Sequence, residues 1–77
     1  MTEMADTEVD ATGLRCPMPL LKAKRALNGM QSGQVLQVLS TDAGSVRDFA
    51  VFSEQSGHAL LSSDQDGDVY RHRLRKA

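Results

Sequence analysis

Apolar side chains return along this chain at two different intervals, and these intervals predict where helices and strands lie. In Pro17–Met30 the apolar positions recur every three or four residues, which is the period of one face of an α-helix. The segment Ser45–Gln55 repeats this pattern. Runs of β-branched or alternating apolar and polar residues predict strands, and they cover Thr7–Ala11, Gln34–Thr41, Ala59–Ser63 and Val69–Arg75. The predicted order of elements is βαβαββ.

The connections between these elements predict the fold class. Asp66-Gly67 separates the last two strands, and an Asp-Gly pair is a strong signal of a tight hairpin. Right-handed connections between parallel strands place both helices on the same side of the sheet. We therefore expect an α/β (α+β) two-layer sandwich, in which a four-stranded mixed sheet carries two helices packed on one face. The loops around Cys16 and Asp42 should then be neighbours, at the carboxyl ends of two parallel strands, where such folds usually place function.

The last predicted strand gives the two faces of the sheet different chemistry. Side chains of a strand alternate between its faces. One face receives Tyr70, His72 and Leu74, and the other receives Arg71, Arg73 and Arg75. We expect the histidine to face the helices, partly buried, and the three arginines to lie on the open face.

Length and composition indicate one small domain. The chain has 77 residues, of which 40% are hydrophobic and 25% charged, values typical of a folded chain. We expect a flexible acidic tail at residues 1–6 and a single domain at residues 7–77. No apolar run is long enough to cross a membrane, and the acidic N-terminal residues are unlike a secretory or transit peptide. A single cysteine cannot form an intramolecular disulfide, so we expect a cytoplasmic protein.

Positive charge is concentrated in two segments, although the net formal charge is −1. One segment holds Arg15, Lys22, Lys24 and Arg25, and the other is the basic C-terminal strand. Such clusters are most often solvated surface, but they could also meet an acidic protein or RNA. Aromatic residues, on which bases would stack, make up only 4% of the chain, so an RNA contact should be weak.

The chemistry of the chain centres on Cys16, which lies between the first strand and the first helix. Proline fits the first helical turn, so Pro17 places Cys16 at or beside the N-cap. The positive end of the helix dipole and the cationic Arg15 should then lower the pKa of the thiol. Pro17 and Pro19 stiffen the turn and hold the sulfur outward. The alternative is a buried, inert cysteine, which is the commonest fate of a free thiol, but a proline-flanked loop after a glycine usually faces solvent.

The other candidate chemistry is weaker. His58 and His72 together with Cys16 have the wrong spacing for a local pair of metal ligands, and a structural zinc site needs four ligands. The sequence contains no phosphate-binding loop. We therefore expect neither a metal nor a bound cofactor.

The segment Asp10–Pro19 reads D-A-T-G-L-R-C-P-M-P and resembles the TusA/SirA-like family of sulfur carriers. That family is marked by a C-P-x-P motif at the start of its first helix, preceded by Asp and Gly. The matching residues here are Asp10, Gly13, Cys16, Pro17 and Pro19. The resemblance covers essentially residues 8–76, and it continues through Gly33, Asp42, Asp48, Gly57-His58 and the basic last strand.

This resemblance implies a persulfide relay. A cysteine desulfurase would pass sulfane sulfur to Cys16, which would hand it to a downstream sulfur-acceptor protein. Members of the family serve tRNA 2-thiolation, molybdenum-cofactor enzymes and sulfur oxidation. We expect the site to be supported by Asp10, Gly13, Arg15, Pro17 and Pro19, and we expect partners to be bound by Arg15, Met18, Lys22, Arg25, Asp42 and Arg47. The chain departs from many members at Asp42-Ala43-Gly44, where Asp-Pro is common, and this loop bears on partner choice.

The chain lacks a second, resolving cysteine, so it would act as a relay that depends on its partners rather than as a complete sulfurtransferase enzyme. The sequence leaves two other functions open. One is a non-catalytic regulatory module that binds a protein or RNA through its basic surface, with Cys16 incidental. A third possibility is a peroxide-sensing thiol.

Overall fold

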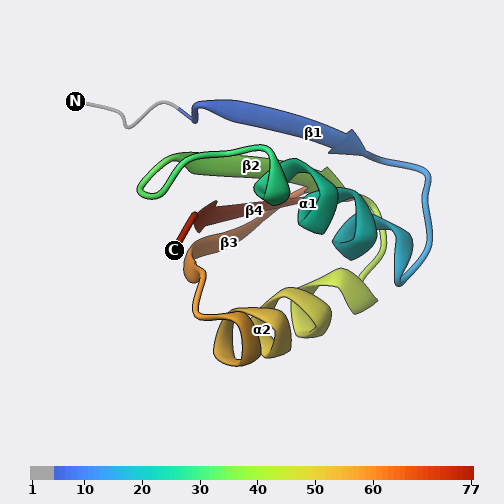
Figure 1. Cartoon of the computed structure of the whole chain (residues 1–77). Coiled ribbons are helices and arrows are strands. Elements are labelled where there is room, and N and C mark those ends of the chain that lie inside the picture. The colour runs from blue at the N-terminus through green and yellow to red at the C-terminus, as the bar shows by residue number, and fades with distance from the viewer. Residues whose placement is uncertain (1–4) are drawn as a thin grey trace.

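Six elements follow one another in the predicted βαβαββ order (Figure 1). The computed structural model describes residues 5–77. The elements are β1 (Thr7–Ala11), α1 (Met18–Asn28), β2 (Val35–Ser40), α2 (Gly44–Ser56), β3 (Ala59–Asp66) and β4 (Val69–Arg75). Compared with the prediction, α1 is shorter at both ends and β3 continues three residues further, to Asp66. The helix α2 ends where Gly57 takes the left-handed conformation, with φ of +84°, which favours glycine because it has no Cβ.

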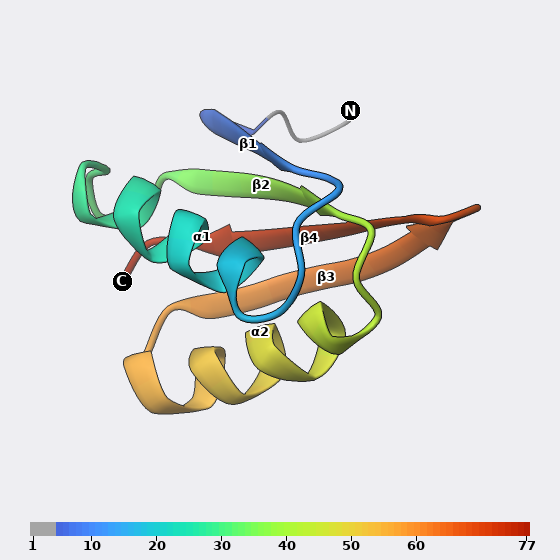
Figure 2. The same cartoon turned by 90° about the vertical axis from the view of Figure 1, so that its right-hand side faces the viewer.

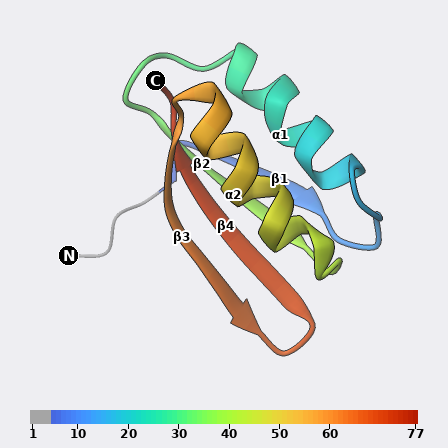
Figure 3. The same ribbon diagram turned by 90° about the horizontal axis from the view of Figure 1, so that it is seen from below.

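The four strands form one mixed sheet in the order β1-β2-β4-β3. The strands β1 and β2 are parallel, and the pairs β2–β4 and β3–β4 are antiparallel. Both helices cover the same face of this sheet, as the view in Figure 3 makes plain. The predicted two-layer sandwich is therefore confirmed. Within residues 5–77, neither helix has the length and apolar character needed to span a bilayer.

The acidic tail expected at residues 1–6 mostly falls on residues 1–4, which lie outside the described residues. Asp6, however, is attached to the sheet. Its backbone N–H donates to the Val35 carbonyl at 2.8 Å, and its carboxylate accepts the Val35 N–H at 2.8 Å. Asp6 therefore belongs to the domain, because its side chain satisfies a backbone donor at the start of β2.

The hairpin between β3 and β4 turns one residue later than the Asp-Gly signal suggested. Asp66 is still in β3 and pairs with Val69, so the loop consists of Gly67 and Asp68. Gly67 has φ of +60°, and no residue other than glycine has positive φ among those described. A two-residue hairpin with positive φ only at its first position is of type II′, which favours glycine there.

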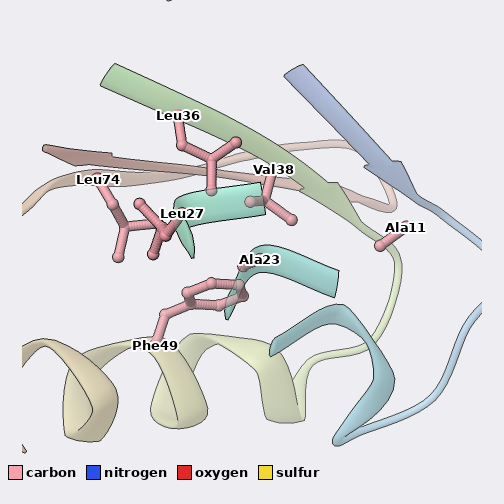
Figure 4. Close-up of a cluster of buried hydrophobic side chains, with 7 residues drawn as sticks. All are labelled: Ala11, Ala23, Leu27, Leu36, Val38, Phe49 and Leu74. Atoms are coloured by element: carbon pink, nitrogen blue, oxygen red, sulfur yellow. The ribbon is translucent and has the colours of Figure 1, made fainter. Parts of the chain in front are cut away.

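The core lies between the sheet and the two helices. Its fully or almost fully buried members come from five elements: Ala11, Ala23, Leu27, Leu36, Val38, Phe49 and Leu74. Figure 4 shows Phe49 rising from α2 towards the leucines and valine of the sheet and α1. Burying a leucine or phenylalanine side chain completely contributes about 2 kcal/mol each. These contacts fix both helices on one face and so determine where their N-terminal ends lie.

A buried histidine is part of this core. His72 has no exposed surface, and its ring stacks on Phe49 with centroids 4.5 Å apart. Its Nε2 lies 2.9 Å from the Ser45 hydroxyl, and its Nδ1 lies 2.9 Å from the Ser63 hydroxyl. Because Ser45 donates its own proton to the Asp42 carbonyl, Nε2–H donates to Ser45 and Nδ1 accepts from Ser63. The histidine faces the helices as predicted, but it is fully rather than partly buried, because α2 covers it.

Acid should destabilise the fold through His72. Burial lowers the pKa of this imidazole below its ordinary value, so the unfolded chain takes up the proton at a higher pH than the folded chain. The stability contributed by neutral His72 is present above the ordinary histidine pKa and is lost as the pH falls towards the lowered value. Urea unfolding at about pH 7.5 and about pH 5 should show this loss.

The variant His72→Gln tests whether His72 causes this loss of stability in acid. It should cost about 1–3 kcal/mol of unfolding free energy at neutral pH, because a serine hydroxyl loses its partner, and it should reduce the difference between the two pH values. His58→Gln is the comparison at the less buried histidine: burial and then the charge of Lys76 also lower the pKa of His58, but this variant should reduce the difference less than His72→Gln does. An unchanged pH dependence in His72→Gln would contradict the assignment.

Candidate functional site

The site forms where the parallel strands β1 and β2 end. Figure 2 shows the loop that leaves β1 and the loop that leaves β2 running side by side towards the starts of α1 and α2. The Gly13 N–H donates to the Thr41 hydroxyl oxygen at 2.8 Å, which ties the two loops together. The expected proximity of the Cys16 and Asp42 segments is therefore confirmed.

Asp10 shapes the beginning of the β1–α1 loop. Its carboxylate accepts the Thr12 backbone N–H at 3.0 Å and the Thr12 hydroxyl proton at 2.6 Å. These hydrogen bonds lower the pKa of Asp10. The chain then turns through Gly13, whose φ of +80° is unfavourable for residues with a Cβ. Asp10 and Gly13 therefore set the direction in which the loop approaches Cys16.

Cys16 is exposed at the end of this loop. Its backbone N–H donates to Asp42 Oδ2 at 2.6 Å, and its thiol donates to the carboxylate of Asp48. The Cys16–Pro17 peptide bond is cis. Cys16 is thus exposed while its thiol is hydrogen-bonded to an acidic group, so it is not the buried cysteine considered above.

The start of α1 differs by one residue from the prediction. Pro17 is the N-cap and Met18 is the first helical residue, so Cys16 lies just outside the helix, and no side chain caps it. Pro19 lies in the first turn, where its missing N–H leaves no hydrogen bond unmade. Its side chain is fully buried, whereas Met18 is 44% exposed. Pro19 therefore anchors the end of α1 beside the cysteine.

The expectation of a lowered thiol pKa is wrong. The pKa of Cys16 is raised, first by the hydrogen bond to Asp48, then by desolvation, and then by the negative charges of Asp48 and Asp42. A hydrogen bond from the protonated thiol stabilises the neutral form, and nearby carboxylates disfavour the thiolate. The helix dipole does not dominate, because Asp42 in the loop before α2 and Asp48 in α2 bring two carboxylates close to the thiol.

Gly44 permits this close approach. A Cβ at position 44 would lie 3.3 Å from Asp42 Oδ2 and 3.5 Å from the Cys16 Cβ. The first distance is tighter than ordinary van der Waals contact, so a side chain there would push on the Asp42 carboxylate. The Asp42-Ala43-Gly44 sequence, noted above as a departure, thus brings the start of α2 against the cysteine.

A groove of about 360 Å³ runs between the two helices beside the thiol. It is lined by Leu20, Lys24, Arg47, Asp48, Val51, Phe52 and Gln55. The Lys24 ammonium lies 5.4 Å from the centroid of the Phe52 ring, within the range of a cation–π contact. Cys16 does not itself line the groove, but Asp48 both lines the groove and contacts Sγ, so a single side chain separates the groove from the thiol.

The chain is similar to known proteins over nearly its whole length. The family model described as sulfurtransferase TusA matches residues 7–76. The chain belongs to the TusA family. It is 49% identical over 72 residues to a sulfur carrier protein TusA of Allochromatium vinosum, covering 94% of this chain and 95% of that protein. The crystal structure of a SirA-like protein from Desulfitobacterium hafniense has a TM-score of 0.78 at 27% identity, covering 90% of this chain and 95% of the other.

The residues expected to bind partners in this TusA-family chain do not form one cluster. Asp42 contacts Cys16 and Arg47 lines the groove. Met18 is exposed at the start of α1, two positions after the cysteine. Lys22 is close enough to Asp10 to lower its pKa, so it belongs with the β1–α1 loop rather than with the groove. Arg15 and Arg25 are exposed.

The arginines of β4 lie on the opposite face of the sheet. Arg73 Nε donates to Gln37 Oε1 at 2.9 Å, and the Gln37 amide donates to a Glu8 carboxylate oxygen at 2.6 Å. These bonds link β4, β2 and β1 across the face that the helices leave uncovered.

Within residues 5–77, no group of three or more His, Cys, Asp or Glu side chains is arranged to hold a metal ion.

Asp48 is the site residue that the sequence analysis did not assign. It is the fifth residue of α2 and 32 positions from Cys16, so no local pattern connects the two. The only signal was its place in the family resemblance. Lys24, Val51 and Phe52, which line the groove, were likewise not identified as site residues.

The raised pKa of Cys16 can be measured from the pH dependence of alkylation by iodoacetamide. Because the sulfur is exposed, the rate follows the thiolate fraction. The midpoint should lie above that of the same chain unfolded in urea, and Asp42→Asn should lower it by removing a nearby charge. Glu54→Gln, a change at an exposed carboxylate of α2, should leave it unchanged. A midpoint at or below that of the unfolded chain would restore the dipole argument.

Proposed function

We propose that this chain is a sulfur carrier in which Cys16 accepts sulfane sulfur as a persulfide from a cysteine desulfurase and passes it to a thiol of a downstream acceptor protein. The observation that carries the proposal is the exposed Cys16 thiol, presented by a loop that Asp10, Thr41 and Asp42 hold in place. Its full-length similarity to a protein named sulfur carrier protein TusA supports the same role.

The proposed chemistry needs only one cysteine. Transfer of sulfane sulfur from a persulfide to a thiol yields a new persulfide and a new thiol, so no net oxidation or reduction occurs. The chain contains no second cysteine that could release the cargo by forming a disulfide. A thiol that is regenerated in each cycle suits a reducing cytoplasm. Transfer RNA thiolation and the supply of molybdenum-cofactor enzymes are candidate destinations that follow from the family resemblance.

Partners must approach Cys16 closely, because both transfers join its sulfur to a sulfur of another protein. We assign the docking surface to the side of the molecule that carries the thiol: Met18, Lys24, Arg47, Val51 and Phe52. Exposed apolar side chains supply contact area there, and the two cations favour an acidic partner surface. Lys22 and Arg25 extend the positive charge along α1, and Arg15 adds to it from the β1–α1 loop.

Intact-mass spectrometry tests the relay directly. After incubation with a cysteine desulfurase, cysteine and pyridoxal phosphate, the protein should gain about 32 Da, the mass of one sulfur atom. Dithiothreitol should remove the added mass. Cys16→Ser should gain nothing under the same conditions. A wild-type protein that stays unmodified by an active desulfurase would refute the carrier function.

A pair of charge reversals separates the relay from the alternative regulatory module. Arg47→Glu should slow loading from the desulfurase about tenfold, since Arg47 lies in the groove beside Cys16 and charge reversal weakens electrostatic steering. Loading from a small-molecule persulfide should hardly change. Arg73→Glu alters the opposite face of the sheet and should leave both rates unchanged. If Arg73→Glu abolished binding to a protein or RNA partner while Arg47→Glu had no effect, the interaction module would be the better description.

A further inference from the structure

The carboxylate of Asp48 is positioned to exchange a proton with the sulfur that reacts. It accepts the hydrogen bond of the Cys16 thiol and forms part of the wall of the groove between α1 and α2. Asp48 lies in α2 and is half-buried. The residue that follows it in this helix, Phe49, is completely buried in the core. Its position is therefore set by the packing of α2 and not by a mobile loop.

We propose that Asp48 takes the thiol proton of Cys16 when sulfur is loaded and returns a proton to the Cys16 sulfur when the cargo is released. This inference rests on the proposed carrier function and adds a catalytic residue to it. Asp48 qualifies as catalytic because it contacts the reacting atom.

Loading is then a balanced exchange. As Cys16 Sγ attacks the terminal sulfur of the donor persulfide, its proton moves to Asp48. The new S–S bond forms at Sγ while the S–S bond of the donor breaks, and the electron pair of that bond goes to the donor sulfur. The donor leaves as a thiolate and recovers the proton from Asp48. The products are a Cys16 persulfide and a donor thiol, with no oxidant or reductant consumed.

Release runs the same sequence in reverse. The acceptor thiol gives its proton to Asp48, and its sulfur attacks the outer sulfur of the Cys16 persulfide. The S–S bond to Sγ breaks, and its electron pair stays on Sγ. Asp48 then protonates Sγ, which restores the original thiol and its hydrogen bond. The acceptor carries away the sulfane sulfur as a persulfide.

The surroundings of the thiol explain why it needs a proton acceptor. The same contacts that raise the thiol pKa leave little thiolate at neutral pH, so the sulfur is a poor nucleophile until its proton is removed. A docked partner would also cover the apolar wall of the groove, formed by Leu20, Val51 and Phe52. Bulk water would then be a less available proton carrier than a carboxylate already in contact.

Neighbouring groups are engaged elsewhere. Asp42 Oδ2 already accepts the Cys16 backbone N–H and is needed to hold the loop. Both ring nitrogens of His72 are bonded to serines inside the core. His58 Nδ1 accepts the Ala77 N–H at the other end of α2. Among residues 5–77, Asp48 is therefore the group with both the contact and the chemistry for the role.

Asp48→Asn separates proton transfer from a simple charge effect. The amide keeps the size of the side chain but cannot take up the proton. Without the carboxylate the thiol pKa should fall, so alkylation of unloaded protein at neutral pH should become faster. Release of sulfur from the loaded protein to dithiothreitol, followed by quenched intact-mass spectrometry in a single turnover, should become at least about tenfold slower.

If Asp48 acted only through its charge, Asp48→Asn would change the alkylation rate and the release rate in the same direction. A lower thiol pKa makes Cys16 a better leaving group, so a pure charge effect would accelerate release as well as alkylation. Faster or unchanged release in Asp48→Asn would therefore overturn the proposal. Asp48→Glu, which retains a carboxylate, should restore a substantial part of the release rate.

Glu54→Gln is the matched control. It removes a carboxylate from the same helix, but six residues beyond Asp48, or about 9 Å along the helix axis, and it should leave both rates unchanged. Circular dichroism and thermal unfolding of each variant should match the wild type, since Asp48 is only half-buried. If wild-type protein cannot be loaded at all, the carrier function fails. If it loads and Asp48→Asn releases normally, only the role of Asp48 fails.

Discussion

The parallel pairing of β1 with β2 is the constraint on which the site depends. It brings the carboxyl ends of both strands to one edge of the sheet, so the loops leading into α1 and α2 meet there. The Gly13–Thr41 and Cys16–Asp42 hydrogen bonds then join residues 28 and 26 positions apart. If β2 were antiparallel to β1, its carboxyl end and Asp42 would lie at the opposite edge of the sheet from Cys16. The cysteine would then lack its acidic partners.

The structure presents the thiol without activating it electrostatically. Exposure makes Cys16 accessible to another protein, while Asp48 and Asp42 favour the protonated form. Such a thiol reacts slowly with small electrophiles in solution, because the thiolate is the reactive species. A carrier gains selectivity from this combination, since chemistry then depends on a docked partner and on a proton acceptor in contact with sulfur. The combination is less suited to a peroxide sensor, which needs a readily ionised thiol.

The site is also connected to the hydrophobic core. Ser45 donates to the Asp42 carbonyl and accepts from His72, whose ring stacks on Phe49. The backbone of the loop that holds Cys16 is therefore bonded to a network that is completely buried. Asp48 is adjacent to Phe49 on α2, so the same packing positions both carboxylates. This arrangement holds a surface thiol against acidic groups without burying the thiol itself.

The order of elements, the two-layer architecture and the exposed position of Cys16 followed from the sequence, because they depend on periodicity and on turn residues that act locally. The helical period of the segment after Pro17 and the alternation in Val69–Arg75 needed no knowledge of distant contacts. The protonation behaviour of Cys16 was wrongly predicted, since neighbours in the sequence suggested only a helix end and Arg15. Asp48 contacts the thiol from 32 positions away, and only the packing of α2 beside α1 decides which of the chain's carboxylates meets the sulfur.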